Sequence, residues 1–193
     1  MGQREEAIDQ FSKAIELNSS CSLSLHFRGN AHAALAQWGK AASDYSGALA
    51  VHSDRDDVLN GLAWLLAACP DPGFRDPSRA VELARKAITL EPTQGNYWNT
   101  LGAAHYRLGN WDSAVTSLKK SMELRRGGDG FDWVFLAMAR WQQGEKEEAR
   151  NCYDQAIRWM EKNRPNHEEL RGLRLEAAAL LQIDQRTRNR TNI

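Results

Sequence analysis

Residues 113–124 read SAVTSLKKSMEL, and variants of this stretch recur along the whole chain. The related stretches are EAIDQFSKAIEL at 6–17, KAASDYSGALAV at 40–51, RAVELARKAITL at 79–90 and EARNCYDQAIRW at 148–159. In each stretch a small residue stands in second place, and another small residue follows seven positions later. A spacing of seven returns to the same side of an α-helix, so five helices with one closely packed face are expected.

The recurrence has a nearly constant interval. The first small residues are Ala7, Ala41, Ala80, Ala114 and Ala149, which lie 34, 39, 34 and 35 residues apart. A further helical stretch precedes each of the last four, with a large apolar residue followed four positions later by a small one. These pairs are Leu25 and Gly29, Leu59 and Ala63, Trp98 and Gly102, and Trp133 and Ala137. Small residues on both helices let the two axes approach closely, which predicts antiparallel helix hairpins.

A period of about 34 residues built from two helices resembles the tetratricopeptide repeat. The resemblance covers residues 4–162 and implies an all-α fold, a right-handed α-solenoid of antiparallel hairpins. Two positions depart from the family pattern. Arg28 stands where the family has Leu, and the family's Pro after the second helix remains only as Pro92.

The expected organisation is a single solenoid over residues 4–183. It consists of a half repeat at 4–18, hairpins at 22–53, 56–92, 95–126 and 130–162, and an amphipathic helix at 165–182. The last of these resembles the family's capping helix, whose polar face shields the end of a solenoid from water. Residues 185–193 are rich in Arg, Asn and Thr and are expected to form a disordered tail.

The interval of 39 places five extra residues in the segment from Cys69 to Pro77. Proline and glycine in this segment end the helix, and Asp76-Pro77 is a good start for the next one. The insert is interpreted as a longer surface turn, with a binding loop around Phe74 as the alternative. Together with LAWLLAACPDP at 62–72, it resembles a bacterial subgroup in which such arrays often follow a Ser/Thr kinase.

The first helix of the first repeat is missing from the pattern. Part of the apolar face formed by Ile8, Phe11 and Ile15 is therefore expected to lack a partner. Two interpretations follow: the chain is a piece of a longer array, or this end associates with something, including end-to-end self-association.

The resemblance also implies a binding surface. In this family the first helix of each hairpin lines a concave groove that binds a protein or a peptide. The candidate groove residues are His26, Asn30, Asn60, Trp64, Asn96, Asn99, Tyr106, Arg107, Phe131, Val134, Met138 and Trp141. Asparagine amides can hold a peptide backbone, and Trp, Tyr and Arg dominate binding hot spots. The family's clamp for a C-terminal carboxylate is mostly missing, because His26, Asn96 and Thr100 replace its basic residues.

Composition narrows the function further. Lys and Arg total 25 and Asp and Glu total 25, so the formal net charge is zero and nucleic acid is a poor candidate partner. No stretch is long and apolar enough to span a membrane, and residues 1–7 contain no apolar run that could serve as a signal peptide. The three scattered cysteines fit a reducing compartment, so a cytoplasmic location is expected. The five histidines lack a metal-ligand spacing, and no nucleophile–base set or phosphate loop is found.

The sequence therefore predicts a non-catalytic protein–protein interaction module without metal or cofactor. The alternative is a C-terminal regulatory or scaffolding region of a larger protein, such as a bacterial Ser/Thr kinase. No kinase motif occurs in the chain itself.

Overall fold

The computed structural model describes residues 2–183, and the expected tail at 185–193 lies outside the described residues. Helices account for the regular structure of the described part, which contains no strand. The helices are α1 (Gly2–Leu17), α2 (Ser22–Ala34), α3 (Trp38–Val51), α4 (Asp56–Ala68), the short 3-10 helix η1 (Pro72–Phe74), α5 (Pro77–Leu90), α6 (Gly95–Arg107), α7 (Trp111–Leu124), α8 (Gly130–Gln142), α9 (Lys146–Asn163) and α10 (Glu168–Leu180).

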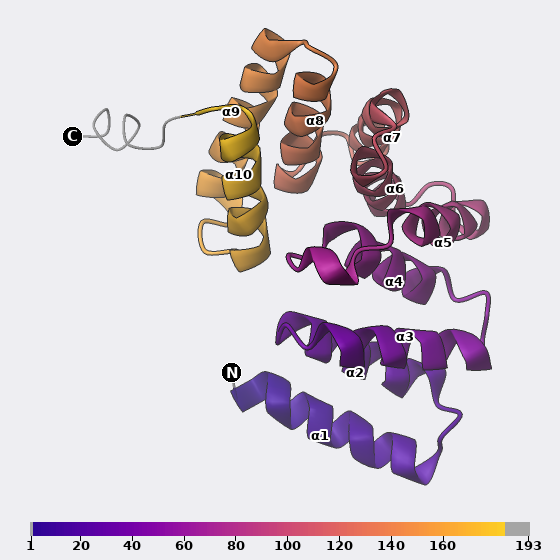
Figure 1. Cartoon of the computed structure of the whole chain (residues 1–193). Helices are drawn as coiled ribbons and strands as arrows, with labels where there is room; N and C mark the ends of the chain where they lie inside the picture. Colours follow the sequence, from indigo (N-terminus) through magenta and orange to yellow (C-terminus); the bar gives the residue numbers. More distant parts are fainter. Residues whose placement is uncertain (1, 184–193) are drawn as a thin grey trace. The chain divides into compact units, whose positions relative to one another are not determined.

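The chain forms two compact units, Met1–Thr93 and Gln94–Ile193, each with its own helices. The first unit holds α1 to α5 and the second holds α6 to α10. Neighbouring helices pair as hairpins, α2 with α3, α4 with α5, α6 with α7 and α8 with α9 (Figure 1). The single solenoid expected over 4–183 stays a prediction.

Small residues allow the close pairing within each hairpin. A methyl group built on Gly29 would lie 2.9 Å from the Tyr45 ring, and one built on Gly102 would lie 2.6 Å from Leu118. Contacts this short do not occur between real side chains, so only glycine allows these helix separations. The small residues of the second helices, such as Ala41 in α3 and Ala114 in α7, are fully buried.

Arg28 has a partner that explains its departure from the repeat pattern. Its guanidinium donates two hydrogen bonds to the Asp44 carboxylate, at 2.8 and 2.6 Å, and a third to Ser12 Oγ at 3.2 Å. Asp44 is buried, so a paired cation is needed beside it. Arg28 therefore joins α1, α2 and α3 through polar contacts where the family uses an apolar one.

The insert between α4 and α5 folds back on itself. Arg75 Nε donates to the Cys69 carbonyl at 2.6 Å, and the Asp76 amide donates to the Leu66 carbonyl at 3.0 Å. Asp76 also caps α5 by accepting from the Arg79 amide. The segment is thus an ordered surface turn, with Phe74 partly exposed beside Gly39.

In the second unit, α10 packs on α8 and, less extensively, on α9 (Figure 1). Its buried apolar residues are Leu170, Leu173, Ala177 and Ala178, followed by Leu181 just after the helix. A side chain at Gly130, where α8 begins, would overlap Leu170. The last helix therefore seals the apolar side of the preceding hairpin, as the sequence-based comparison with a capping helix implies.

Candidate functional site

The candidate groove residues of the first unit lie on α2 and α4. Asn30 is exposed, and two neighbours hold its side chain in place. Its Oδ1 accepts a hydrogen bond from the Tyr45 hydroxyl at 2.7 Å, and its Nδ2 lies 3.2 Å from His26 Nε2. The amide is therefore fixed in orientation at the surface of α2.

His26 lies almost buried, with 8% of its surface exposed, between Asn30 and an ion pair. Its Nδ1 is 3.2 Å from Asp57, whose carboxylate also accepts from Arg55 at 2.8 and 2.5 Å. If Nε2 accepts from Asn30, the ring proton sits on Nδ1 and points to Asp57. Burial lowers the pKa of His26, Asp57 opposes that effect and Arg55 adds to it. A neutral His26 ring can therefore accept from Asn30 and donate to Asp57.

Asp57 keeps its charge despite the partial burial of its carboxylate. Burial works against ionisation, but the hydrogen bonds and the charge of Arg55 hold the pKa of Asp57 below its usual value. The amide of Val58 also donates to this carboxylate at 2.8 Å. The cluster of His26, Arg55 and Asp57 is thus an organised polar surface at the start of α4.

Asn60 and Trp64 follow Asp57 at spacings of three and seven on α4, which places them on the same side of the helix. Both are half-buried. Asn60 Oδ1 is buried and has no hydrogen-bond partner among the residues that the structure describes. A buried acceptor without a donor is costly, so this amide lowers the stability of the first unit.

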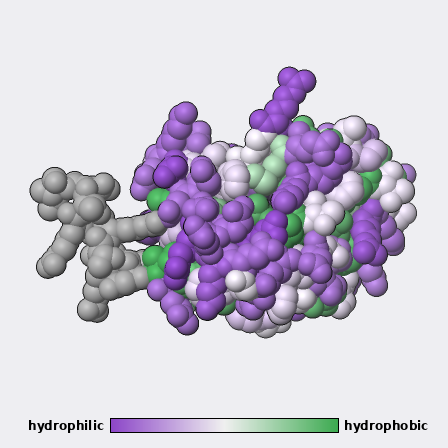
Figure 2. Space-filling view, turned by 90° about the horizontal axis from the view of Figure 1, so that it is seen from above, coloured by the Kyte–Doolittle hydropathy of each residue, from purple (hydrophilic) through white to green (hydrophobic). Residues whose placement is uncertain are grey.

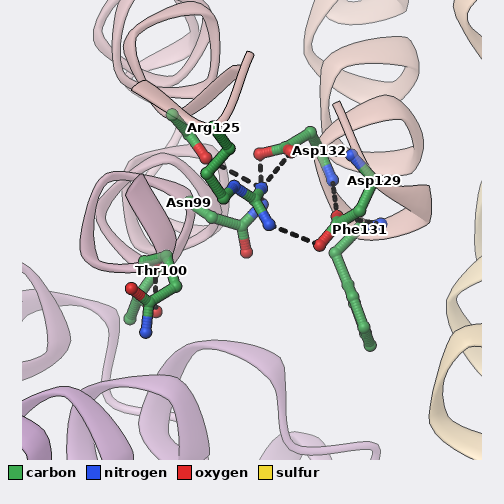
Figure 3. A network of polar contacts seen from close by, with 8 residues as sticks. Asn99, Thr100, Arg125, Asp129, Phe131 and Asp132 are labelled. Atoms are coloured by element: carbon green, nitrogen blue, oxygen red, sulfur yellow. Dashed lines mark hydrogen bonds and ion pairs between the residues drawn. The ribbon is translucent and has the colours of Figure 1, made fainter. Parts of the chain in front are cut away.

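In the second unit, the amide nitrogen of Asn99 is already used within the fold (Figure 3). Asn99 is 6% exposed, and its Nδ2 donates to Asp132 Oδ1 at 2.7 Å. Arg125 pairs with the other oxygen of Asp132 and also donates to Asp129 at 2.6 Å. Asn99, Arg125 and Asp132 therefore tie α6 and the end of α7 to the start of α8.

Asp132 is fully buried within this network. Burial raises its pKa, the neighbouring Asp129 carboxylate adds to the increase, and Arg125 opposes both. Asp129 and Asp132 also form a capping box at the start of α8. The sequence analysis did not identify this pair. Two acidic residues three positions apart, at the start of an apolar helix, could have indicated a capping box.

Two of the α8 positions expected in the groove are enclosed within the second unit. Val134 and Met138 are fully buried, and the Phe131 ring meets the His167 ring edge-on at 5.6 Å. Figure 3 shows Phe131 directed away from the Asp132 network. Binding of a partner by Val134 or Met138 stays a prediction, and it would require the surrounding side chains to move.

Arg107 also serves α10. Its guanidinium forms a two-pronged ion pair with the Glu176 carboxylate, one bond of which measures 2.8 Å. The same group lies 5.4 Å from the centre of the Tyr106 ring and 5.5 Å from that of Phe135. With 8% of its side chain exposed, Arg107 is a buried link between α6 and α10.

The remaining candidates of the second unit are more accessible. Asn96 is exposed, and Tyr106 and Trp141 are half-buried. Two cations lie near the Trp141 ring, Lys146 at 5.2 Å and Arg150 at 5.7 Å from its centre. Both belong to α9, so they hold this ring toward the start of that helix.

Other features limit the chemistry of the described surface. Among residues 2–183, no three His, Cys, Asp or Glu side chains gather closely enough to hold a metal ion. Within the same range, no helix is both long and apolar enough to cross a bilayer. On the face seen in Figure 2, hydrophilic side chains predominate and hydrophobic ones form small groups among them.

Comparisons with known proteins agree with the repeat. Two family models, each described as tetratricopeptide repeat, match residues 99–126 and 133–163. No curated protein matches the sequence significantly.

Several solved structures share the fold. TTC0263, a thermophilic TPR protein in Thermus thermophilus, aligns with a TM-score of 0.68 and 19% identity over 94% of this chain and 92% of its own. YrrB, a TPR protein with an unusual peptide-binding site, aligns with a TM-score of 0.64 and 20% identity over 92% and 84%. MamA AMB-1 gives 0.67 and 22% over 83% and 91%. These similarities confirm the predicted all-α solenoid.

Proposed function

Because the chain is a tetratricopeptide-repeat protein, we propose that it is a non-catalytic interaction module that binds an extended peptide along α2 and α4. The family is a protein-interaction fold, and YrrB is a relative in fold with a peptide-binding site. The proposal places the peptide in the first unit, on the surface formed by His26, Asn30, Asn60 and Trp64.

The observation that carries this proposal is the fixed, exposed amide of Asn30. Tyr45 and His26 hold this amide in one orientation before any partner arrives, which lowers the entropy cost of binding. A peptide backbone offers an N–H and a carbonyl in each residue, and it can use such an amide without a particular sequence. The half-buried Trp64 would contact a side chain of the same peptide.

The candidate residues of the second unit are less accessible, which supports placing the peptide on the first unit. Asn99 donates to Asp132, Arg107 pairs with Glu176, and Val134 and Met138 are fully buried. A peptide there would have to break contacts that stabilise the unit. The first unit needs no such rearrangement at Asn30.

A peptide-display selection against the purified chain tests the proposal. The dissociation constant of the best selected peptide is then measured for the wild type and for Asn30→Ala and Trp64→Ala. Each substitution is expected to weaken binding about tenfold, as for a hot-spot residue. Ser43→Ala, at an exposed position of α3, serves as control and should leave affinity unchanged. Enrichment of no peptide, or equal affinity of all variants, would refute the proposal.

The alternatives have less support. Attachment to a Ser/Thr kinase is not supported by the two family models or by the similar structures named above. A scaffolding role within a larger protein, cytoplasmic location and end-to-end self-association through α1 stay predictions.

A further inference from the structure

The imidazole of His26 stands in the middle of a row of polar contacts that runs from α3 through α2 to α4. The Tyr45 hydroxyl donates to Asn30 Oδ1 at 2.7 Å, and Asn30 Nδ2 lies 3.2 Å from His26 Nε2. On the other side of the ring, His26 Nδ1 lies 3.2 Å from Asp57 Oδ2. Because Asn30 and Asp57 contact opposite ring nitrogens, the protonation of His26 decides what Asn30 must donate or accept.

Asp57 determines which ring nitrogen carries the proton when His26 is neutral. Its carboxylate stays ionised near neutral pH, because its pKa is lowered. A proton on Nδ1 can be donated to this carboxylate, whereas a lone pair on Nδ1 would face a negatively charged oxygen. Arg55 lies farther from Nδ1, at 3.5 Å, and donates to both oxygens of Asp57. With the proton on Nδ1, Nε2 keeps the lone pair that accepts from Asn30.

A second proton on the His26 ring would remove this acceptor. The new Nε2–H would point at the Asn30 amide nitrogen, which has no lone pair to offer. The hydrogen bond forms again only if the amide flips, so that Oδ1 accepts from His26 and Nδ2 donates to the Tyr45 oxygen. The amide would then present a donor where it had presented an acceptor, and the reverse.

Asn30 retains bonding capacity for a ligand in either orientation. A side-chain amide has two N–H groups and two oxygen lone pairs, and His26 and Tyr45 use one of each. Because Asn30 is exposed, the remaining N–H and lone pair are available to a peptide backbone. A backbone N–H that bonds Oδ1 in one orientation would meet an N–H in the other. The two orientations therefore cannot bind the same peptide in the same way.

The charged and titratable groups around His26 come mainly from one side. Arg55 and Asp57 face it from the start of α4, and the Tyr45 ring of α3 lies 6.1 Å away between ring centres. Toward α1 the neighbour is Phe27, whose ring stacks on His26 at 5.3 Å and on Phe11 of α1 at 5.6 Å.

These surroundings favour the neutral ring at pH 7. Burial is the largest effect and lowers the pKa of His26, Asp57 raises it and Arg55 lowers it further. The ring therefore gains its second proton below the ordinary histidine value of about 6.5. The peptide surface is thus in its neutral-ring form near pH 7 and changes in mildly acidic solution.

We infer that His26 is a positioning residue for the peptide surface, and that its protonation flips the Asn30 amide and releases the peptide. The inference rests on the proposed function and adds its regulation by pH. Binding should be constant above the pH at which His26 titrates. Below that pH the affinity should fall by up to about tenfold per pH unit, because the binding-competent form must lose one proton.

Nuclear magnetic resonance of the unliganded chain tests the positioning without any peptide. At pH 8, the ¹⁵N shifts of the His26 ring should show a protonated Nδ1 and an unprotonated Nε2. On titration to about pH 5, the side-chain NH₂ resonances of Asn30 should move with the same midpoint as His26. Protonated Nε2 at pH 8, or Asn30 resonances that do not follow His26, would overturn the inference.

The affinity of a selected peptide without Asp, Glu or His tests the consequence, because only the protein then titrates in this range. One pH unit below the His26 midpoint, the wild type should bind about tenfold more weakly than at pH 8. His26→Gln cannot titrate, so its affinities at the two pH values should be equal. His52→Gln, at an exposed position after α3, is the matched control and should keep the wild-type profile. Circular dichroism at each pH verifies that all three proteins stay folded.

A wild-type pH dependence that His26→Gln retains would overturn the inference and leave the proposed peptide surface standing. The same holds for a wild-type affinity that does not change through the His26 midpoint. Failure of the selection to enrich any peptide would instead refute the proposed function, and the release of a peptide would fall with it. In that case the resonances of His26 and Asn30 still decide whether the ring positions the amide.

Discussion

At the scale of single residues, Arg28 illustrates what repeat matching could and could not predict. The sequence shows that a charged residue occupies an apolar position of the repeat. It does not show that Asp44, one helix later, turns its carboxylate toward that charge and is itself buried. The two departures from an apolar core compensate each other, because a buried carboxylate is tolerated when a guanidinium binds both of its oxygens.

Ala36 is a second residue whose role depends on backbone geometry. It follows α2 at the position that Gly109 and Gly144 occupy after α6 and α8, and it adopts the same left-handed conformation with φ of 56°. In all three turns the next amide donates to a carbonyl five residues earlier, as in a Schellman motif. Of these three turns, only the first uses a residue with a Cβ in this conformation.

Ala36→Gly is therefore expected to stabilise the protein by about 0.5–1 kcal/mol, because it removes the steric cost of a left-handed alanine and Ala36 is exposed. Urea unfolding monitored by circular dichroism measures the change. Ala50→Gly, at an exposed helical position of α3, is the matched control and should destabilise by a similar amount. A loss of stability in Ala36→Gly would contradict the interpretation.

Asp132 predicts a pH dependence of opposite sign to that of an ordinary ion-paired carboxylate. Because its pKa is raised in the folded state, the fold holds the proton more tightly than the unfolded chain does. Its contribution to the unfolding free energy is therefore greatest below the ordinary carboxyl pKa and declines as pH rises through the folded-state value. The difference in unfolding free energy between the wild type and Asp132→Asn should thus decrease with rising pH, starting at about pH 4.

Denaturant titrations of both proteins at matched pH values measure this difference. Near neutral pH, Asp132→Asn should still be less stable, by about 1–3 kcal/mol, because Arg125 keeps its charge and loses one of its two carboxylate partners. Asp112→Asn, at an exposed position of α7, controls for the general effect of removing a carboxylate. A difference that grows with pH would show that Arg125, and not burial, dominates the pKa of Asp132.

At the scale of helices, the packing of α10 determines whether the candidate residue Arg107 is accessible to a partner. Helical register was enough to place the candidates on α6 and α8, because a spacing of three or four keeps side chains on one face. It could not show that Glu176, which lies 69 residues after Arg107, would form an ion pair with Arg107. The contact depends on how a terminal helix packs on α8, and no repeat pattern specifies that packing.

Glu176→Gln tests the contribution of this contact. The substitution leaves the Arg107 charge in a nearly buried site without its carboxylate, so a loss of about 1–3 kcal/mol in unfolding free energy is expected. Guanidinium unfolding is unsuitable because its salt screens charges, so urea is the better denaturant. Glu168→Gln, an exposed carboxylate on the same helix, should change stability by less than about 0.5 kcal/mol. Equal effects of the two substitutions would show that the ion pair contributes nothing.

At the scale of the whole chain, the repeat pattern predicts the fold better than it predicts which groove residues are exposed. Five second helices were expected from one small-residue pattern, and all five are helical, from α1 to α9. The pattern is local, and each helix in a solenoid meets only its neighbours, so the fold can be predicted from it. The exposure of a groove position depends on side chains from other helices, such as Asp132 for Asn99, and was not predictable in the same way.

The same nearest-neighbour logic predicts unequal stability along the chain. The α1 helix packs on one neighbour and buries no residue, whereas α10 packs on two helices and buries Leu170 and Leu173. Amide hydrogen exchange should therefore be fastest in peptides from 2–17, slower in those from 38–51, and slow again in those from 168–180. Mass spectrometry of exchanged, pepsin-digested protein resolves these segments. Protection of 2–17 equal to that of 38–51 would contradict this order. Fast exchange in 168–180 would instead mean that α10 opens readily despite its two neighbouring helices.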